Sequence, residues 1–85
     1  MKLLKFTAPW CGQCRVLTKQ MSSFNTCDVV AYDVEDEENE SLIERYSIKN
    51  LPLLVLVDDN DNEIKRWPGI VNVNTLKSEI ESLAQ

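Results

Sequence analysis

The sequence predicts an α/β domain whose elements follow the order βαβαββα. Short runs rich in Leu, Val and Tyr, typical of strands, alternate with segments that repeat apolar residues at helical spacing. A continuous apolar run in the second half is followed by an Asp- and Asn-rich turn and another strand-like segment, which indicates a hairpin. At 85 residues, with 44% hydrophobic and 27% charged residues, the chain has the size and composition of one globular domain over residues 1–85.

The first strand is expected from Lys2 to Thr7, an apolar-rich run that ends in Ala-Pro. A helix should then begin around the Cys-x-x-Cys segment and continue to about Phe24. Its apolar positions, at i, i+3, i+7 and i+10 of one helical face, are Cys14, Leu17, Met21 and Phe24. Cys14 is therefore expected on the buried face of this helix.

Asp28 to Val34, rich in Val and Tyr, predicts a second strand. The acidic run from Glu35 to Glu38 follows, and such runs are more often solvated than part of a binding site. It leads into a helix expected from about Glu37 to Ser47, whose apolar side consists of Leu42, Ile43 and Tyr46.

Leu53 to Val57 is a continuous apolar run, the pattern of a strand buried on both faces. The polar turn 58–62 joins it to a strand from Glu63 to Trp67, so these two strands form an antiparallel hairpin. A final helix follows, with Asn72 as its N-cap and an apolar stripe at Val73, Leu76, Ile80 and Leu83. The aromatic residues expected in the core are Phe6, Phe24, Tyr32 and Trp67.

The charge balance argues against a phosphate-binding surface. The formal net charge is -5, and Lys and Arg do not cluster along the chain, whereas nucleic-acid affinity depends on clustered basic residues. The apolar start of the chain is interrupted by Lys5 and Pro9 and is too short for the hydrophobic part of a secretory signal. We therefore expect a cytoplasmic protein that binds neither nucleic acid nor membranes.

The segment APWCGQC, residues 8–14, places two cysteines three positions apart. Such a pair can ligate a metal, form a reversible disulfide or simply begin a helix. A structural zinc site needs four N or S ligands, and the chain offers only Cys27 as a third cysteine and has no histidine. A redox pair is therefore the leading interpretation, with no metal bound and Cys27 expected to be a small buried apolar residue.

The two cysteines should have different roles. Cys11 is expected to lie exposed just before the first helical turn, where unpaired N–H groups and the positive end of the helix dipole favour a thiolate. Only the thiolate attacks a disulfide, so Cys11 is the predicted nucleophile. Cys14, covered and half a turn away, is the predicted resolving thiol.

Trp10-Cys11-Gly12-x-Cys14 after a strand, Leu51-Pro52 before a buried strand and Gly69 after the hairpin together resemble the thioredoxin family over nearly the whole chain. The resemblance implies a thioredoxin-like fold, with a four-stranded mixed sheet and helices on both faces. It also implies that Pro52 follows a cis peptide bond opposite the cysteines. The substrate surface would comprise Trp10, Gly12, Gln13, Leu51, Pro52 and Gly69.

In function, the resemblance implies a monomeric protein-disulfide reductase that cycles through a Cys11–Cys14 disulfide and binds no cofactor. Its electrons would come from NADPH through a flavoprotein similar to thioredoxin reductase. The chain lacks the strand and helix with which family members usually begin, so its size is closer to that of a glutaredoxin. Glutaredoxins typically carry a Gly-Gly pair that helps hold glutathione, whereas here Gly69 is followed by Ile70, which favours protein disulfides as substrates. The alternatives are a glutathione-dependent reductase and a binding module on the same scaffold.

Three positions depart from the thioredoxin pattern. Gln13 replaces a proline between the cysteines, which leaves the redox potential open. Lys5 stands six residues before Cys11, where thioredoxins keep a buried aspartate, and Ala31 replaces the usual lysine partner of that aspartate. An ammonium near Cys14 would favour the thiolate forms, but a lysine stem can also carry its charge out to water, and the sequence leaves both interpretations open.

Overall fold

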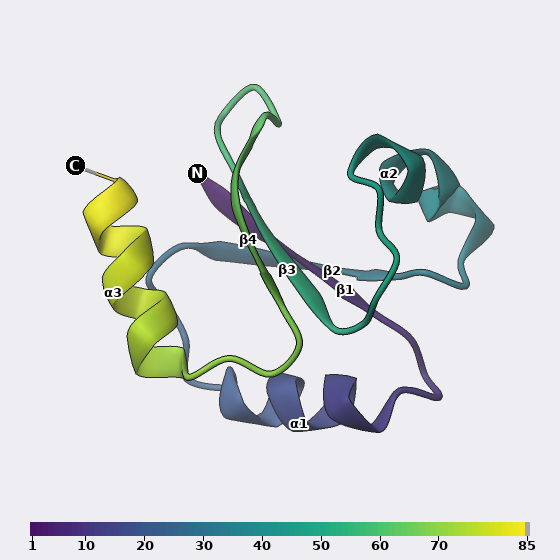
Figure 1. Ribbon diagram of the computed structural model, residues 1–85, viewed down its shortest axis with the longest axis horizontal. Coiled ribbons are helices and arrows are strands. Elements are labelled where there is room, and N and C mark those ends of the chain that lie inside the picture. The colour runs from purple at the N-terminus through teal and green to yellow at the C-terminus, as the bar shows by residue number, and fades with distance from the viewer. Residues whose placement is uncertain (85) are drawn as a thin grey trace.

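The computed structural model describes residues 1–84 and contains one four-stranded sheet (Figure 1). The strands are β1 (Lys2–Thr7), β2 (Asp28–Asp33), β3 (Leu53–Val57) and β4 (Glu63–Pro68). Their order across the sheet is β2-β1-β3-β4. β1 pairs in parallel with β2 and antiparallel with β3, and β3 pairs antiparallel with β4. The predicted mixed sheet and the element order βαβαββα are therefore confirmed.

The helices cover both faces of the sheet, as the resemblance implied. They are α1 (Gly12–Gln20), α2 (Glu40–Arg45) and α3 (Val73–Leu83), with a short 3-10 helix at Glu37–Asn39 before α2. α1 and α3 pack on one face, where Leu17, Leu76 and Ile80 join a cluster with Leu3. α2 packs on the other, where Leu42 and the nearby Tyr46 contact Phe6 and its neighbours. Because parallel strands need a crossover connection, α1 lies between β1 and β2 in the chain.

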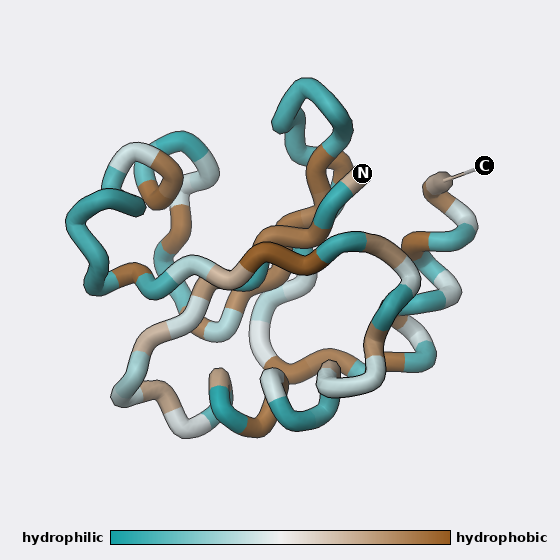
Figure 2. The backbone as a smooth tube through the Cα atoms, turned by 180° about the vertical axis from the view of Figure 1, so that it is seen from behind, coloured by the Kyte–Doolittle hydropathy of each residue, from teal (hydrophilic) through white to brown (hydrophobic). Residues whose placement is uncertain are grey.

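Alternation along β1 directs neighbouring residues to opposite faces. Leu3 belongs to the cluster under α1 and α3, whereas Leu4 and Phe6 belong to the cluster under α2. All five residues of β3 are buried, which confirms that this strand is covered on both faces. In Figure 2 the central strands are hydrophobic, whereas the β3–β4 turn is hydrophilic.

The predicted bounds of four elements were wrong. α1 ends at Gln20 rather than near Phe24, because the chain leaves the helix at Met21 and turns through two serines, which favour turns over helix interiors. The second helix is split, with only residues 40–45 in α2, and the backbone of Ser47 adopts a left-handed conformation (φ 52°) just after it. β2 ends one residue early, at Asp33, and β4 continues one residue further, to Pro68.

The core contains most of the expected residues. Phe6 and Trp67 are buried, whereas Tyr32 and Phe24 are only partly buried at the edges of the two clusters. Leu83 was expected to complete the apolar stripe of α3, but 43% of its surface is exposed because it lies in the last turn, beyond the edge of the sheet. Within residues 1–84, none of the helices is long and apolar enough to span a membrane.

Candidate active site

Cys11 is the N-cap residue of α1. Its backbone is extended (φ -88°, ψ 108°), and its Sγ accepts the backbone N–H of Cys14 at 3.2 Å. The N–H of Cys11 itself donates to the carbonyl of Ala8 at 3.2 Å, which closes the turn between β1 and the helix. The sulfur therefore lies at the end of the helix where unpaired donors stabilise negative charge, as the sequence predicted.

Cys11 is less accessible than expected. Its residue is 8% exposed, because it packs into a small cluster with Ala8 and Cys14 that Val34 and Leu51 cover from the side. The expectation of an exposed thiol was therefore wrong, since a neighbouring loop distant in sequence closes over the helix start. Both Cys11 and Cys14 are free thiols in the structure.

Cys14 lies in the first turn of α1 and faces the sheet, with 2% of its surface exposed. Burial, helped by the hydrogen bond and the negative charge of Cys11, raises the pKa of the Cys14 thiol to about 11. The backbone near Ala8 and the charge of Lys5 act in the opposite direction but do not overcome burial. Cys14 therefore keeps its proton at neutral pH in the dithiol state.

The loop before β3 lies against the cysteines. The Leu51–Pro52 peptide bond is cis, as the resemblance implied, and the side chain of Leu51 packs against the cluster that contains Cys11. Pro52 is buried, and its carbonyl accepts the N–H of Gly69 at 2.9 Å. This hydrogen bond joins the cis-proline loop to the loop at Gly69. Gly69 has a φ of +74°, a conformation that glycine adopts without strain.

Trp10 lies at the surface beside the cysteines and is 65% exposed, which shows that it does not cap the core. Its Nε1 donates a hydrogen bond to the carboxylate of Glu35, in the acidic run after β2. The ring lines a groove of about 490 Å³ together with Ile43, Ile48 and Leu51. Gly12 and Gln13, between the cysteines, are exposed.

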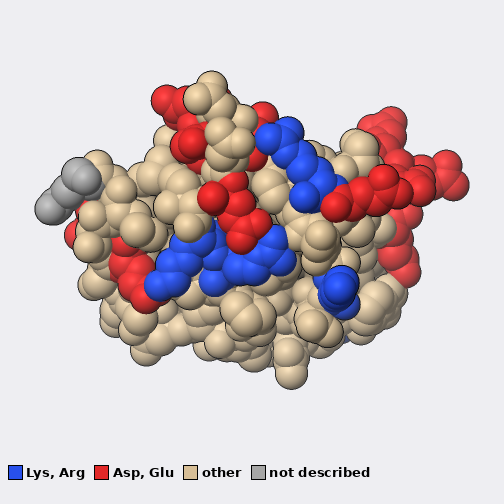
Figure 3. Space-filling model, turned by 45° about the horizontal axis from the view of Figure 1, so that its top comes forward, with Lys and Arg blue, Asp and Glu red and all other residues tan. Residues whose placement is uncertain are grey.

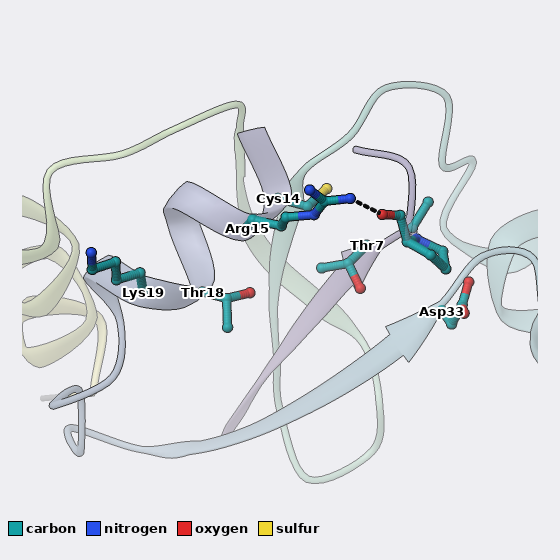
Figure 4. Close-up of a pocket in the computed structure, with 8 residues that line it drawn as sticks. Thr7, Cys14, Arg15, Thr18, Lys19 and Asp33 are labelled. Carbon is teal, nitrogen blue, oxygen red and sulfur yellow. Dashed lines mark hydrogen bonds between the residues drawn. The ribbon is translucent and has the colours of Figure 1, made fainter. Parts of the chain in front are cut away.

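A second hollow lies on the other side of Cys14 (Figure 4). This pocket, of about 420 Å³, includes Cys14, Thr18 and Lys19 of α1 and Asp33 at the end of β2. Arg15 also lines it, and its guanidinium donates to the carbonyl of Pro9 at 2.8 Å. Sequence reasoning missed Arg15, although its position directly after Cys14 in a short helix was a usable signal.

Lys5 reaches the same region from β1. Its Nζ donates to the hydroxyl of Thr18 at 3.1 Å. Partial burial lowers the pKa of Lys5, while the neighbouring Cys14 acts to raise it. The ammonium therefore lies near Cys14 and also reaches the surface, and both interpretations of Lys5 stay predictions.

Cys27 lies apart from this pair. It is half-buried and packs against the cluster under α1 and α3, and burial raises the pKa of its thiol. In the described part of the chain, no group of three or more His, Cys, Asp or Glu side chains is placed to hold a metal ion.

A cysteine that caps a helix, a covered cysteine three residues later and a cis-proline loop beside both define the class of thiol-disulfide oxidoreductases. Comparison with known proteins gives the family. The family model for thioredoxin matches residues 1–82, and the chain belongs to the thioredoxin family. It is thus a protein-disulfide oxidoreductase, and thioredoxins work through a redox-active disulfide without a bound cofactor.

The relatives agree in sequence and in structure. Thioredoxin 1 of Synechococcus elongatus is 30% identical over 80 residues, which cover 87% of this chain and 75% of that protein. The thioredoxin of Chlamydia pneumoniae is 33% identical over 70 residues, covering 80% of this chain and 68% of the relative. The solved structure of a mutant thioredoxin from Halobacterium salinarum superposes with a TM-score of 0.83 at 30% identity, covering 99% of this chain and 74% of the other.

Proposed function

We propose that this protein is a cytosolic dithiol carrier that reduces disulfides of other proteins through a reversible Cys11–Cys14 disulfide. The observation that carries the proposal is the unequal placement of the two thiols. Cys11 caps α1 with its sulfur held by a backbone donor, whereas Cys14 is buried with a pKa of about 11. Cys11 is therefore expected to attack the substrate first, and Cys14 is expected to react only afterwards.

The proposed reaction has two exchanges. The thiolate of Cys11 attacks one sulfur of a substrate disulfide, a new S–S bond forms, and the other substrate sulfur leaves as a thiolate that takes up a proton. Cys14 then loses its proton and attacks the Sγ of Cys11. The Cys11–Cys14 bond forms, the bond to the substrate breaks, and the second substrate sulfur leaves with the electron pair. The substrate is reduced by two electrons and the protein is oxidised by two.

The surface around Cys11 supports a protein substrate. Trp10 directly precedes the cysteine pair and is exposed, and Ile70 is exposed in the loop that joins the cis-proline loop through Gly69. Leu51 packs against the cluster that contains Cys11. An extended peptide lying across Leu51 would place its cysteine over Cys11 and its neighbouring side chains on these apolar residues. We assign Gly12, Gln13, Pro52 and Gly69 to the same contact surface.

Electrons are proposed to return through a partner reductase. The family uses a reductase in general, and for this chain we propose an NADPH-dependent flavoprotein similar to thioredoxin reductase. Such an enzyme would reduce the Cys11–Cys14 disulfide and leave the protein without a cofactor of its own. We further propose that the carrier is a monomer, because the reaction described above needs a single chain.

The test is the reduction of insulin by dithiothreitol, with and without the protein. Acceleration is expected, and it should disappear in Cys11→Ser but persist in Cys27→Ser, which keeps the proposed pair. A binding module whose thiols have no role gives no acceleration. Turnover that requires glutathione would indicate the glutathione-dependent alternative.

Trapping gives a second, independent test. Cys14→Ser removes the resolving attack, so Cys11 should remain in a mixed disulfide with the substrate. The double variant Cys11→Ser/Cys14→Ser is the control and should trap nothing. Equal trapping by the double variant would mean that Cys27 is the reactive thiol and would overturn the assignment.

A further inference from the structure

The ammonium of Lys5 lies beneath α1, the helix that begins at the two cysteines. Residues of β1 alternate between the two faces of the sheet, and Leu3 lies on the face covered by α1 and α3. Lys5, two residues later, points to the same face. The side chain of Lys5 therefore runs from β1, a central strand, under the first turns of α1 and behind the cysteines.

The ammonium of Lys5 has a fixed partner on that helix. Its Nζ donates to Thr18 Oγ1 at 3.1 Å, and Thr18 is four residues after Cys14, one turn along the same helical face. Cys14 and Thr18 both line the 420 Å³ pocket (Figure 4). The hydrogen bond thus holds the positive charge of Lys5 on the side of Cys14 that is remote from Cys11 and the substrate surface.

The other charged groups around Cys14 are differently placed. Arg15 points its guanidinium at the carbonyl of Pro9, and Lys19 lies at the far end of the pocket, in the last turn of α1. Asp33, the carboxylate that lines this pocket, accepts the N–H of Glu35. Among these groups and Cys11, only Cys11 and Lys5 act on the pKa of Cys14 through their charge, and they act in opposite directions.

We propose that Lys5, held by Thr18, is a positioning residue that stabilises the thiolate of Cys14 during the resolving step. This inference rests on the proposed function. In that step the proton of Cys14 leaves to water in the pocket, the thiolate attacks Cys11 Sγ, and the substrate sulfur departs with the electron pair. Lys5 neither gives nor takes the proton, and its fixed charge lowers the free energy of the thiolate relative to the thiol.

The charge of Lys5 matters most in the second exchange, when Cys11 is already bound to the substrate. Once Cys11 is bound to the substrate, its sulfur carries no charge, so its repulsion of a Cys14 thiolate is gone. Burial still disfavours the thiolate, because an ion loses its hydration there. The backbone near Ala8 and the ammonium of Lys5 still stabilise the thiolate, and only the ammonium does so with a full charge, which acts most strongly in a partly desolvated site. Lys5 therefore acts chiefly on the second exchange and little on the first.

A single-thiol titration tests the electrostatic part. In a Cys11→Ser/Cys27→Ala background Cys14 is the remaining thiol, and its ultraviolet thiolate absorbance is followed against pH. The midpoint of Lys5→Met should lie about half a pH unit above that of Lys5→Arg, which keeps its charge throughout the titration; this is the effect of one charge across a partly hydrated gap of several ångströms. The unaltered background should lie between the two, because Lys5 loses its own charge in the upper part of the titration. Lys19→Met, which removes a cation that lines the pocket together with Cys14 and Thr18, is the matched control and should leave the Cys14 midpoint unchanged.

Two-step kinetics tests the catalytic part in the full chain. An aromatic disulfide such as DTNB releases one coloured thiolate when Cys11 attacks and a second when Cys14 resolves the mixed disulfide. Lys5→Met should slow the second release roughly threefold at neutral pH, the loss of thiolate that half a pH unit implies, and leave the first unchanged. If the first release is absent in the unaltered protein, the proposed function fails. If both releases occur and Lys5→Met slows neither, only the role of Lys5 fails.

Folding is controlled separately. Circular dichroism reports whether Lys5→Met is folded, and Lys5→Gln, which keeps a polar end that can bond to Thr18, is measured beside it. Thr18→Val leaves Lys5 in place but removes its partner, so it should shift the Cys14 midpoint upward by less than Lys5→Met. Superimposed titration curves for the Lys5→Arg and Lys5→Gln variants would overturn the proposal, because a charge at position 5 would then have no effect on the Cys14 thiol.

Discussion

The two reactive cysteines differ because a helix begins between them. Cys11 keeps an extended backbone and accepts a donor from the first turn, whereas Cys14, in the first turn of α1, faces the sheet and is buried. The same sequence spacing thus produces a sulfur at the helix end and a sulfur in the core. Burial raises the pKa of Cys14 to about 11, so below that pH the dithiol holds its resolving proton until Cys11 has reacted.

This difference predicts the order in which iodoacetamide alkylates the three cysteines at neutral pH. Cys11 should react first, because its sulfur lies at the N-terminal end of α1 beside a backbone donor rather than in the core under the helix. Cys14 is 2% exposed with a raised pKa, and burial also raises the pKa of Cys27, so both should react slowly. Mass mapping of partly alkylated protein checks the order, and early modification at Cys14 or Cys27 would contradict it.

At the scale of elements, a few side chains fix where helices and turns begin. Asn72 caps α3 by accepting two backbone N–H groups of its first turn. Asp58 likewise accepts two backbone N–H groups and so organises the β3–β4 turn. Glu79 accepts hydrogen bonds from Lys65 and from the indole of Trp67, which ties α3 to β4. The contacts of Asn72 and Glu79 hold in place α3, the helix that covers the sheet beside α1.

Asn72→Ala is expected to destabilise the protein by about 1 kcal/mol, the usual cost of removing an N-cap side chain. Two helix N–H groups would then lose their acceptor. Asn74→Ala is the matched control, because it keeps the backbone donor and places a better helix former inside α3. Urea unfolding of both variants measures the difference. Equal midpoints for the two would show that the cap contributes nothing.

Glu79 predicts a pH dependence of stability. Hydrogen bonds from Lys65, and then from Trp67, lower the pKa of its carboxyl from 4.5. A carboxyl with a lowered folded pKa stabilises the protein above its ordinary pKa, and this contribution is lost as pH falls through the folded value. Glu79→Gln should therefore lower the melting temperature at neutral pH and reduce its fall in acid. Glu81→Gln, on the exposed side of α3, is the control, and identical pH profiles for Glu79→Gln and the unaltered protein would refute the assignment.

At the scale of the whole molecule, local patterns predicted the elements but not how distant segments meet. The apolar run of β3 and the alternation in β1 report burial directly, and both strands have the predicted bounds. The end of α1 depended on a turn at Met21 that the apolar spacing does not encode. The covering of Cys11 by Leu51 and the pocket between α1 and Asp33 arise from packing of segments far apart in sequence. Lys5 was placed near Cys14 by analogy, but its bond to Thr18 required the fold.

The distribution of charge is also a property of the whole fold. The net charge is -5, and Figure 3 shows acidic side chains at several places on one face, most extensively at its top and along its right edge, with basic side chains in the middle. One acidic segment, residues 35–40, is brought to the active site because Glu35 binds the indole of Trp10. Glu37 and Glu38, in the same segment, are exposed. An approaching substrate therefore meets several carboxylates beside the groove at Trp10, whose own lining includes one cation, Lys49.

We expect this charge to favour substrates whose cysteine is flanked by basic residues. Two peptides that differ only in Lys or Glu beside a disulfide should be reduced at different rates, the Lys peptide roughly tenfold faster at low salt, since steering of this kind raises association rates by at least that much. Salt should narrow the difference, because charges at the surface are screened beyond the Debye length. Glu37→Lys/Glu38→Lys should reduce or reverse the preference, whereas Glu81→Lys, which lies on α3, changes the net charge without changing the charge beside Trp10. If Glu81→Lys and a single Glu37→Lys alter the two rates equally, the net charge of the molecule governs the encounter and the acidic segment at the active site has no role of its own.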